Sequence, residues 1–307
     1  MKNKHINPKI GYAYVVLAAL LWAVSGSAAK FLFHQGISAF ELVQLRITTS
    51  AFVLLLFFAL RSPSLLRIEK KDIPYFMILG CVAMAAVQYT YLLAISKINV
   101  AAAILLQYLA PGFIAVYTVV IAREKADPLT IGAVVMATAG CYLVVGAYQM
   151  DVFSLNRTGI VSGIFSAVFF AWYSIQGEYG MRKYSAWTVL TYAMLFAALS
   201  WNVFYPPLTA YARSYGPAEW FWIFYIAVMG TAMPFGLYLK GVAYIRSTRA
   251  SITATLEPIT AGIISYIFLN EVMEPLQMGG GVLVIASIIL LQTQRLRAGC
   301  LQTGEST

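Results

Sequence analysis

The sequence predicts an all-α polytopic membrane protein: ten transmembrane helices form two inverted five-helix repeats, with both termini in the cytoplasm. Three observations predict this fold: apolar stretches recur along the whole chain, the second half repeats the first in register, and basic residues gather in alternate loops. Of the 307 residues, 61% are hydrophobic and 11% are charged, whereas a soluble domain carries about a quarter charged residues. A soluble fold of this size could not bury so much apolar surface, so lipid surrounds most of the chain.

Apolar runs bounded by charged residues and by Pro or Gly define the helices, and most approach the ~20 residues that cross a bilayer. The least distinct boundaries are the end of the seventh span, near Asn202, and the join between the eighth and ninth spans. The expected spans are 9–32, 40–60, 73–96, 99–121, 128–147, 157–180, 187–206, 218–243, 250–270 and 274–293.

The second half of the chain repeats the first at a shift of 147 residues without a gap. Generic apolar helices would match Leu with Ala by chance, but they would not bring a glutamate and two prolines into register. We therefore expect a first repeat at 9–147 (helices 1–5), a second repeat at 157–293 (helices 6–10) and a cytoplasmic tail at 294–307. The matched pairs include Tyr91 with Tyr238, Leu109 with Leu256, Pro111 with Pro258, Glu124 with Glu271 and Pro128 with Pro275.

Five helices per repeat is an odd number, so the second copy must cross the membrane in the opposite sense to the first. Cytoplasmic loops are enriched in Lys and Arg, and equivalent loops of the two copies do differ in charge. The loop with Arg61, Arg67, Lys70 and Lys71 corresponds to one that carries only Arg213. This difference predicts a cytoplasmic N-terminus and C-terminus in a multi-pass protein of the inner (plasma) membrane.

Several classes of function lack the residues they would need. The histidines are His5 and His34, and Cys81, Cys141 and Cys300 show no CxxC spacing, so we expect neither a disulfide framework nor a metal site. The net charge of +9 is dispersed between apolar runs and forms no basic stripe, which argues against nucleic acid. No nucleotide-binding loop or catalytic constellation is recognisable, so we expect no cofactor and no enzymatic activity.

Short motifs resemble those of one family. They are Gly11 to Trp22, Arg46, the Tyr91-Leu92-Leu93-Ala94 run, Arg249-Ala250-Ser251, Leu256-Glu257-Pro258 and Asn270-Glu271. Over residues 10 to 293 the chain resembles the EamA-type ten-helix members of the drug/metabolite transporter superfamily. One departure is that the first half has Ala110-Pro111 where the second has Glu257-Pro258. The resemblance implies export, or sometimes uptake, of small metabolites such as amino acids.

Prolines and one carboxylate inside the spans indicate where helices open toward a cavity. A proline frees the carbonyl four residues earlier, which must then find another donor in lipid, so Pro111, Pro234 and Pro258 are candidate hinges or kinks. Glu257 lies about 12 Å along a helix from Arg249, deep in the hydrocarbon region. A carboxylate at that depth must be paired, protonated or in contact with water, and such a group marks a pathway.

Polar and aromatic side chains in mid-helix are expected to face the interior of the bundle. Arg46, six residues into the second helix, is expected instead to extend to the outer interface, and Glu124 and Glu271 to fix loops at helix ends. Gly279-Gly280-Gly281 is expected to allow close helix packing or a dimer contact. The candidate substrate-binding residues are Trp22, Gln88, Gln107, Tyr108, Tyr173, Gln176 and Glu257.

These features favour a secondary transporter that moves a small organic metabolite, an amino acid or similar solute, and exports it by alternating access. The alternatives are an exchanger or efflux pump for a nucleotide-like or cationic drug-like solute, or a non-transporting receptor or enzyme. The expected partners are the solute and the lipid bilayer. Whether protons take part, and whether the protein is a monomer or a homodimer, stays open at this level.

Overall fold

The computed structural model describes residues 8–125, 127–149, 156–269 and 274–304, and of these it gives only the backbone path for 265–269 and 293–304. The described residues form helices and turns and contain no strand. The first half comprises α1 (Pro8–His34), α2 (Ala39–Arg61), α3 (Ile73–Met77), α4 (Ala85–Lys97), α5 (Val100–Gln107), α6 (Ala110–Val116) and α7 (Pro128–Val144). The second comprises α8 (Arg157–Gly180), α9 (Ala186–Phe204), α10 (Pro217–Ala227), α11 (Met233–Ala254), α12 (Leu256–Leu269) and α13 (Pro275–Gly304).

The helical segments fall on the spans expected from the sequence. Within the described residues, 8 helices are long and apolar enough to cross a membrane, and Pro128–Val144 is a shorter apolar helix. One of the eight, Pro217–Ala254, has 38 residues, which is about 57 Å at 1.5 Å per residue, well beyond the ~30 Å hydrocarbon core. It bends at Arg246, whose φ is 69° and ψ is 162°. The number of membrane crossings therefore stays a prediction, while the all-helical membrane fold is clear.

Three of the long helices contain π-helical segments, where the backbone makes i→i+5 hydrogen bonds. Residues Ile78–Met84 join α3 to α4, Tyr117–Ile121 follow α6, and Val228–Ala232 join α10 to α11. Such segments leave carbonyl groups free of the usual helix bonding and are frequent at functional sites.

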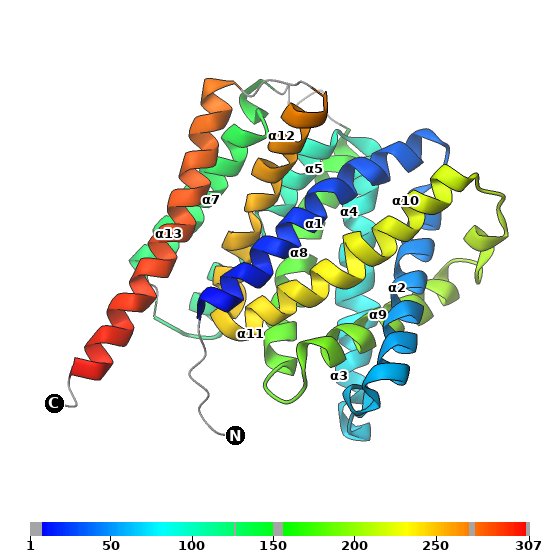
Figure 1. Cartoon of the computed structure of the whole chain (residues 1–307), viewed down its shortest axis with the longest axis horizontal. Helices are drawn as coiled ribbons and strands as arrows, with labels where there is room; N and C mark the ends of the chain where they lie inside the picture. The colour runs from blue at the N-terminus through cyan, green and yellow to red at the C-terminus, as the bar shows by residue number, and fades with distance from the viewer. Residues whose placement is uncertain (1–7, 126, 150–155, 270–273, 305–307) are drawn as a thin grey trace.

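Equivalent helix breaks and packing pairs relate the two halves. The break between α5 and α6 falls at Tyr108, and 147 residues later Thr255 separates α11 from α12. In the same way Asn99, which begins α5, corresponds to Arg246, where α11 bends. Helix α1 packs along α11 and its equivalent α8 packs along α4, while α7 packs with its own equivalent, α13. Figure 1 shows the α7–α13 pair side by side at one edge of the bundle.

One end of the bundle, here called the basic end, is formed by residues 61–72, 122–125, 181–185 and the bend at Arg246. Ion pairs tie these segments together: Lys183 Nζ lies 2.6 Å from an Asp72 oxygen, and Arg246 pairs with Glu124 and Glu178. Helix α1 begins and α13 ends toward this same side (Figure 1). Its many Lys and Arg residues fit a cytoplasmic face, although the orientation in the membrane stays a prediction. Glu271 and the tail residues 305–307 lie outside the described residues.

Candidate functional site

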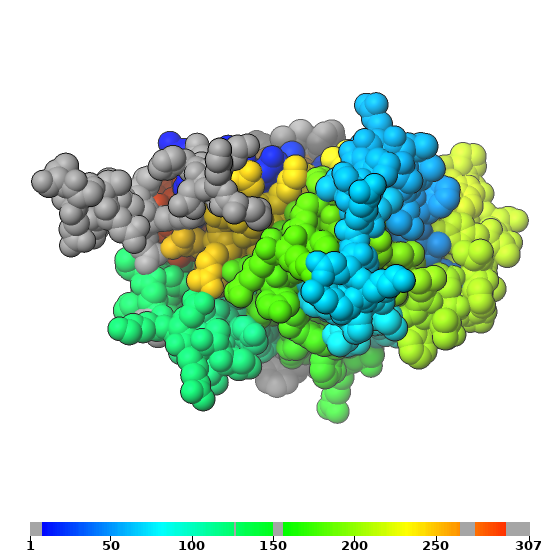
Figure 2. All heavy atoms as spheres, turned by 90° about the horizontal axis from the view of Figure 1, so that it is seen from below, coloured from blue at the N-terminus to red at the C-terminus, as the bar shows by residue number. Residues whose placement is uncertain are grey.

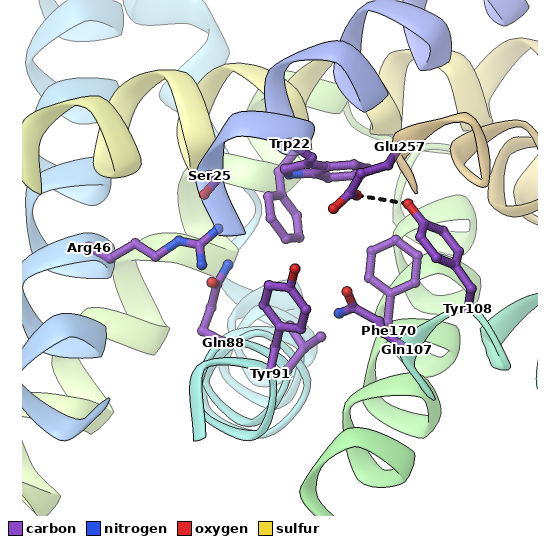
Figure 3. A pocket seen from close by; sticks show the side chains of 11 residues that line it. Trp22, Ser25, Arg46, Gln88, Tyr91, Gln107, Tyr108, Phe170 and Glu257 are labelled. Carbon is purple, nitrogen blue, oxygen red and sulfur yellow. Dashed lines mark hydrogen bonds between the residues drawn. The ribbon is translucent and has the colours of Figure 1, made fainter. Parts of the chain in front are cut away.

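A cavity in the middle of the bundle brings together charged, amide and aromatic side chains from both halves of the chain (Figure 3). The cavity has a volume of about 30 Å³, which is enough for about two water molecules. An organic solute would need more room than this. The lining residues are Trp22, Ser25, Arg46, Val87, Gln88, Tyr91, Gln107, Tyr108, Phe170, Phe235 and Glu257.

Glu257 enters the cavity from the first turn of α12, directly after the helix break at Thr255. The Tyr108 hydroxyl lies 2.8 Å from Glu257 Oε2 and 2.7 Å from the Ala254 carbonyl oxygen. Pro258 has no N–H, so it cannot donate to the Ala254 carbonyl four residues earlier, and Tyr108 is the donor in reach. These contacts fit both protonation states of the Glu257 carboxyl group. When the group is ionised, the Tyr108 hydroxyl can donate to it. When it is protonated, Glu257 can donate to Tyr108, whose hydroxyl then donates to the Ala254 carbonyl.

Arg46 enters the cavity from the opposite wall, on α2 (Figure 3). The side chain is 3% exposed, so the expectation that it extends to the outer interface is wrong. Its Nη2 donates to the Gly230 carbonyl at 2.9 Å, and its Nε donates to Thr231 Oγ1. Pro234 lacks the N–H that would otherwise bond the Gly230 carbonyl, and the π-helical turn at Val228–Ala232 presents both acceptors.

Arg46 is a cation and Glu257 can ionise to a carboxylate, yet the ion pairs formed within the described part of the chain include neither of them. Two of the five guanidinium N–H groups are directed at Gly230 and Thr231, which leaves a fork of donors at the cavity wall. Glu257 has one oxygen facing Tyr108. The cavity is therefore polarised, with a cation on one side and a carboxyl group on the other.

Amide and hydroxyl groups lie between the two charges. Gln88 and Tyr91 project from α4 and Gln107 from the end of α5 (Figure 3). Gln88 is 2% exposed, and its Nε2 lies 3.4 Å from Met84 Sδ, which is a weak acceptor. These groups can exchange their present contacts for hydrogen bonds to a polar solute.

An aromatic cluster of Trp22, Phe170, Phe235 and Tyr238 lies at the cavity, and the first three of these residues line it. The ring centroids of Trp22 lie 5.1 Å from Phe235, 5.6 Å from Tyr238 and 6.1 Å from Phe170, mostly in tilted or edge-on arrangements. Such contacts stabilise a packed layer beyond simple area burial. The cluster therefore gives the cavity an apolar wall.

Five of the seven candidate binding residues line the same cavity: Trp22, Gln88, Gln107, Tyr108 and Glu257. Tyr173 does not line it; its ring packs against Phe235 at 5.7 Å, behind the aromatic cluster. Gln176 lies one turn farther along α8, in a separate pocket of about 280 Å³ beside Tyr75. A substrate role for these two residues stays a prediction.

The candidate hinges lie at breaks in the helices, as the chemistry of proline requires. Pro111 and Pro258 follow the breaks at Tyr108 and Thr255, and Pro234 follows the π-helical turn. Whether they act as hinges during transport stays a prediction. Glu124 forms an ion pair with Arg246, which agrees with the loop-fixing role expected for it.

Sequence reasoning missed Ser25, Val87, Tyr91, Phe170 and Phe235 as lining residues, in addition to Arg46. The repeat gave a signal for Tyr91, because Tyr91 and Tyr238 match in register between the two halves. Ser25 gave none, since small residues occur on every face of α1. Among the described residues, no group of three His, Cys, Asp or Glu side chains lies close enough to hold a metal ion.

Comparison with known proteins identifies the fold and the family. The EamA-like transporter family model matches the chain twice, at residues 9–146 and 157–293. A solved crystal structure aligns with a TM-score of 0.73 and 18% identity, covering 93% of this chain and 98% of that one. This likeness concerns the fold alone.

Among curated proteins, the chain is 29% identical over 291 residues to the uncharacterized inner membrane transporter YicL of Salmonella typhimurium, covering 94% of this chain and 96% of the relative. It is 25% identical over 282 residues to the threonine/homoserine exporter RhtA of Escherichia coli, covering 89% of each chain. It is 24% identical over 296 residues to the pseudopaline exporter CntI of Pseudomonas aeruginosa, covering 92% of this chain and 96% of the relative. With two matches to the family model and a polar cavity between the matched halves, this multi-pass membrane protein belongs to the EamA-like transporter family and is a transporter, not an enzyme.

Proposed function

We propose that this protein is a secondary transporter that exports a small zwitterionic metabolite, an amino acid or a close analogue, across the inner membrane by alternating access. The observation that carries the proposal is the pair of buried, opposite charges, Arg46 and Glu257, on facing walls of one cavity (Figure 3). The solute carboxylate would bind the guanidinium fork of Arg46, and the solute ammonium would approach Glu257.

The energetics of burial support this assignment. Removing an ion from water into a protein interior has a penalty of several kcal/mol, which only a partner charge and good hydrogen bonds offset. Arg46 is satisfied in part by neutral acceptors on Gly230 and Thr231. A solute carboxylate that accepts two parallel N–H bonds from the guanidinium would supply both the missing opposite charge and the remaining hydrogen bonds.

The relatives give independent support for the same class of solute. One relative is named a threonine/homoserine exporter, and both of those amino acids are zwitterions at neutral pH. The relatives named as exporters also favour the outward direction for this chain.

Transport would require the cavity to open alternately at its two ends. The two related halves would rock about the cavity, with the helix breaks at Tyr108 and Thr255 as the points of bending. Glu257 would exchange the solute ammonium for a proton, because Tyr108 can hydrogen-bond the carboxyl group in either state. Protons would then be a second partner of the carrier.

Counterflow in proteoliposomes tests the proposal. The probes are an amino acid, the amine that lacks its carboxylate and the acid that lacks its ammonium, each at equal concentration. We expect saturable exchange of the amino acid and at least tenfold weaker exchange of the two truncated analogues, because each leaves one buried charge unpaired. Better transport of the amine would favour the cationic-drug alternative. No flux of any of the three would contradict the proposal.

Glu257→Gln tests the role of the carboxyl group in coupling. The variant keeps size and hydrogen bonding, so we expect normal insertion with loss of gradient-driven accumulation. The matched control is Glu219→Gln, at the start of α10 and away from the cavity. Unchanged rate and pH dependence in Glu257→Gln would show that this carboxyl group is structural.

A further inference from the structure

We infer that Arg246 is the latch of the basic end: its ion pairs with Glu124 and Glu178 hold that end of the transporter closed, and their release opens it. The inference rests on the proposed alternating access. It assigns the opening and closing of the basic end to three residues that lie outside the cavity. They lie where α11 bends, before the segment that leads to Glu257.

The contacts of Arg246 join three separate parts of the bundle. Its Nη1 and Nη2 donate to the two Glu124 oxygens at 3.0 and 2.7 Å, and its Nε donates to Glu178 Oε1 at 3.1 Å. Glu124 follows α6 and its π-helical extension, Glu178 ends α8, and Arg246 belongs to α11. Figure 2, viewed from this end, shows the gold end of α11 between the blue-green segment near residue 125 and the green end of α8.

Glu178 also fixes the start of the helical segment beyond the bend. Its second oxygen, Oε2, accepts the Ser247 backbone N–H at 2.7 Å. A carboxylate at a helix N-terminus satisfies a free N–H and favours the helix dipole. The segment Ser247–Ala254 leads directly to the break at Thr255 and to Glu257. Movement at the latch is thereby connected to the cavity through a single helical segment.

The backbone of Arg246 favours release. Its φ of 69° with ψ of 162° lies in a region that only glycine occupies without strain. The three charge-assisted hydrogen bonds hold the residue in this conformation. Once they break, the backbone relaxes away from the closed geometry, so the latch has a stored tendency to open.

The equivalent joint at the opposite end is built differently. The repeat places Asn99 at the position of Arg246, with an ordinary φ of −69°. In the first helix of each half the repeat matches at a shift of 148 residues, with Gly11 on Gly159, and this places Lys30 at the position of Glu178. Lys30 Nζ donates to the Ile95 and Ile98 carbonyls at 2.9 and 3.2 Å. The basic end therefore has a strained arginine with two ion pairs. At the equivalent joint, Lys30 bonds only to backbone carbonyls.

Cysteine accessibility tests the latch without any need for transport. Cys81, Cys141 and Cys300 are first replaced by Ala. Ser174→Cys then reports on the basic end, because Ser174 is buried one turn beyond Phe170 toward Gly180, and Ala171→Cys serves as a second reporter. A bulky, charged maleimide labels purified protein in nanodiscs, where both faces are open to the reagent.

We expect Glu124→Gln to speed labelling of Ser174→Cys about two- to fivefold, the range for loss of a partly exposed ion pair. Labelling of the protein with Glu124 intact should rise with added salt, which screens exposed pairs, and Glu124→Gln should respond less. Arg246→Ala should open the end more than Arg246→Gly, because alanine retains the backbone strain. The control is Glu219→Gln, the same chemical change at the opposite end.

Labelling that is the same in Glu124→Gln, in Arg246→Ala and in their parent would overturn the latch, whatever solute the protein carries. Faster labelling of both reporters in these variants would support it, even if every solute tested in counterflow failed. The two proposals can therefore fail separately. A change confined to Ser174→Cys and absent from Ala171→Cys would mark a local effect at one reporter and would also count against the latch.

Discussion

The guanidinium of Arg46 is oriented by acceptors that a proline and a π-helical turn make available. The Gly230 carbonyl and the Thr231 hydroxyl bind one edge of the group, and the rest of the fork lines the cavity. A side chain held in this way loses little additional freedom when a carboxylate binds, which favours both affinity and geometric selectivity.

Replacing Arg46 by Gln should therefore weaken solute binding strongly while the protein still inserts. Loss of a buried, charge-assisted partner reduces the binding free energy by about 2 kcal/mol or more, which is roughly a 30-fold loss of affinity. The half-saturation concentration in counterflow measures this loss. Lys240→Gln is the matched control, since Lys240 also lies within a helix but stacks over Tyr14 and Trp187 at 5.1 and 5.7 Å, away from the cavity. Equal losses in both variants would contradict a binding role for Arg46.

The sequence could predict Glu257 but not Arg46, for a simple geometric reason. Glu257 lies about as deep in its expected span, 250–270, as Arg46 does in 40–60, but the short Glu side chain cannot carry its charge from there to the interface. Arg46 lies near the start of its helix, where a long side chain can reach the interface or turn inward, and only the packing of neighbouring helices decides between them. The same limit applies to Gln88 and Gln176, because the rotation of each helix determines which amide faces the cavity.

At the scale of the helices, proline provides the connection between sequence and site. Pro234 and Pro258 leave the Gly230 and Ala254 carbonyls without their helical donors, and Arg46 and Tyr108 bind these carbonyls. The breaks are readable in sequence because proline acts locally. The π-helical turns are not, since they depend on how neighbouring helices accommodate an extra residue in the turn.

The pair α7 and α13 depends on close backbone contact at two glycines. A Cβ on Gly280 would lie 2.7 Å from the Gly140 carbonyl oxygen, and a Cβ on Gly140 would lie 2.8 Å from the Gly280 carbonyl oxygen. Of the run 279–281, only Gly280 makes such a close approach, which confirms helix packing for that residue. Gly279 would meet nothing within 4 Å, and Gly281 only the Ile259 side chain at 4.0 Å.

Gly280→Ala should accordingly lower the melting temperature of the detergent-purified protein, because forcing a methyl group into a packed contact costs about 1–3 kcal/mol. Gly279→Ala is the control one residue away, and it should be neutral or slightly stabilising, since alanine favours helix by roughly 0.5–1 kcal/mol over glycine. Equal melting temperatures for the two variants would show that α7 and α13 pack less closely than described.

At the scale of the whole molecule, the Asp72 carboxylate at the basic end should remain ionised throughout the physiological range. The hydrogen bond from Lys183 lowers the pKa of Asp72 below its usual value, with a further contribution from Tyr184. A lowered pKa means that the contact stabilises the fold above the ordinary Asp pKa and that this contribution disappears as pH falls through the lowered value. The difference in melting temperature between the protein and its Asp72→Asn variant should be constant from pH 8 to about 5 and shrink below about pH 4. A difference that changes between pH 6 and 8 would contradict this assignment.

The two-fold relation between the halves was the most productive prediction from sequence, because duplicated chains keep special residues in register. The equivalent breaks in the structure, at Tyr108 and Thr255 and at Asn99 and Arg246, follow the same register, although the sequence did not place them. It could not anticipate that the second copy would place a strained arginine at its joint, because backbone conformation at a helix junction depends on contacts with Glu124 and Glu178, which are distant in sequence.

The orientation of the molecule in the membrane can be tested at specific loops. The segments that share the basic end in the structure also carry most of the Lys and Arg residues, and such loops remain in the cytoplasm. Reporter enzymes active only in the periplasm should therefore be inactive when fused after Arg67, Lys125 or Lys183. Fusions after Tyr148 or Arg213 should be active, because these residues lie at the opposite end, where Tyr148 contacts Glu274 and Arg213 contacts Glu41. Full reversal would overturn the cytoplasmic placement of the basic end, while a mixed pattern would overturn the ten-helix count.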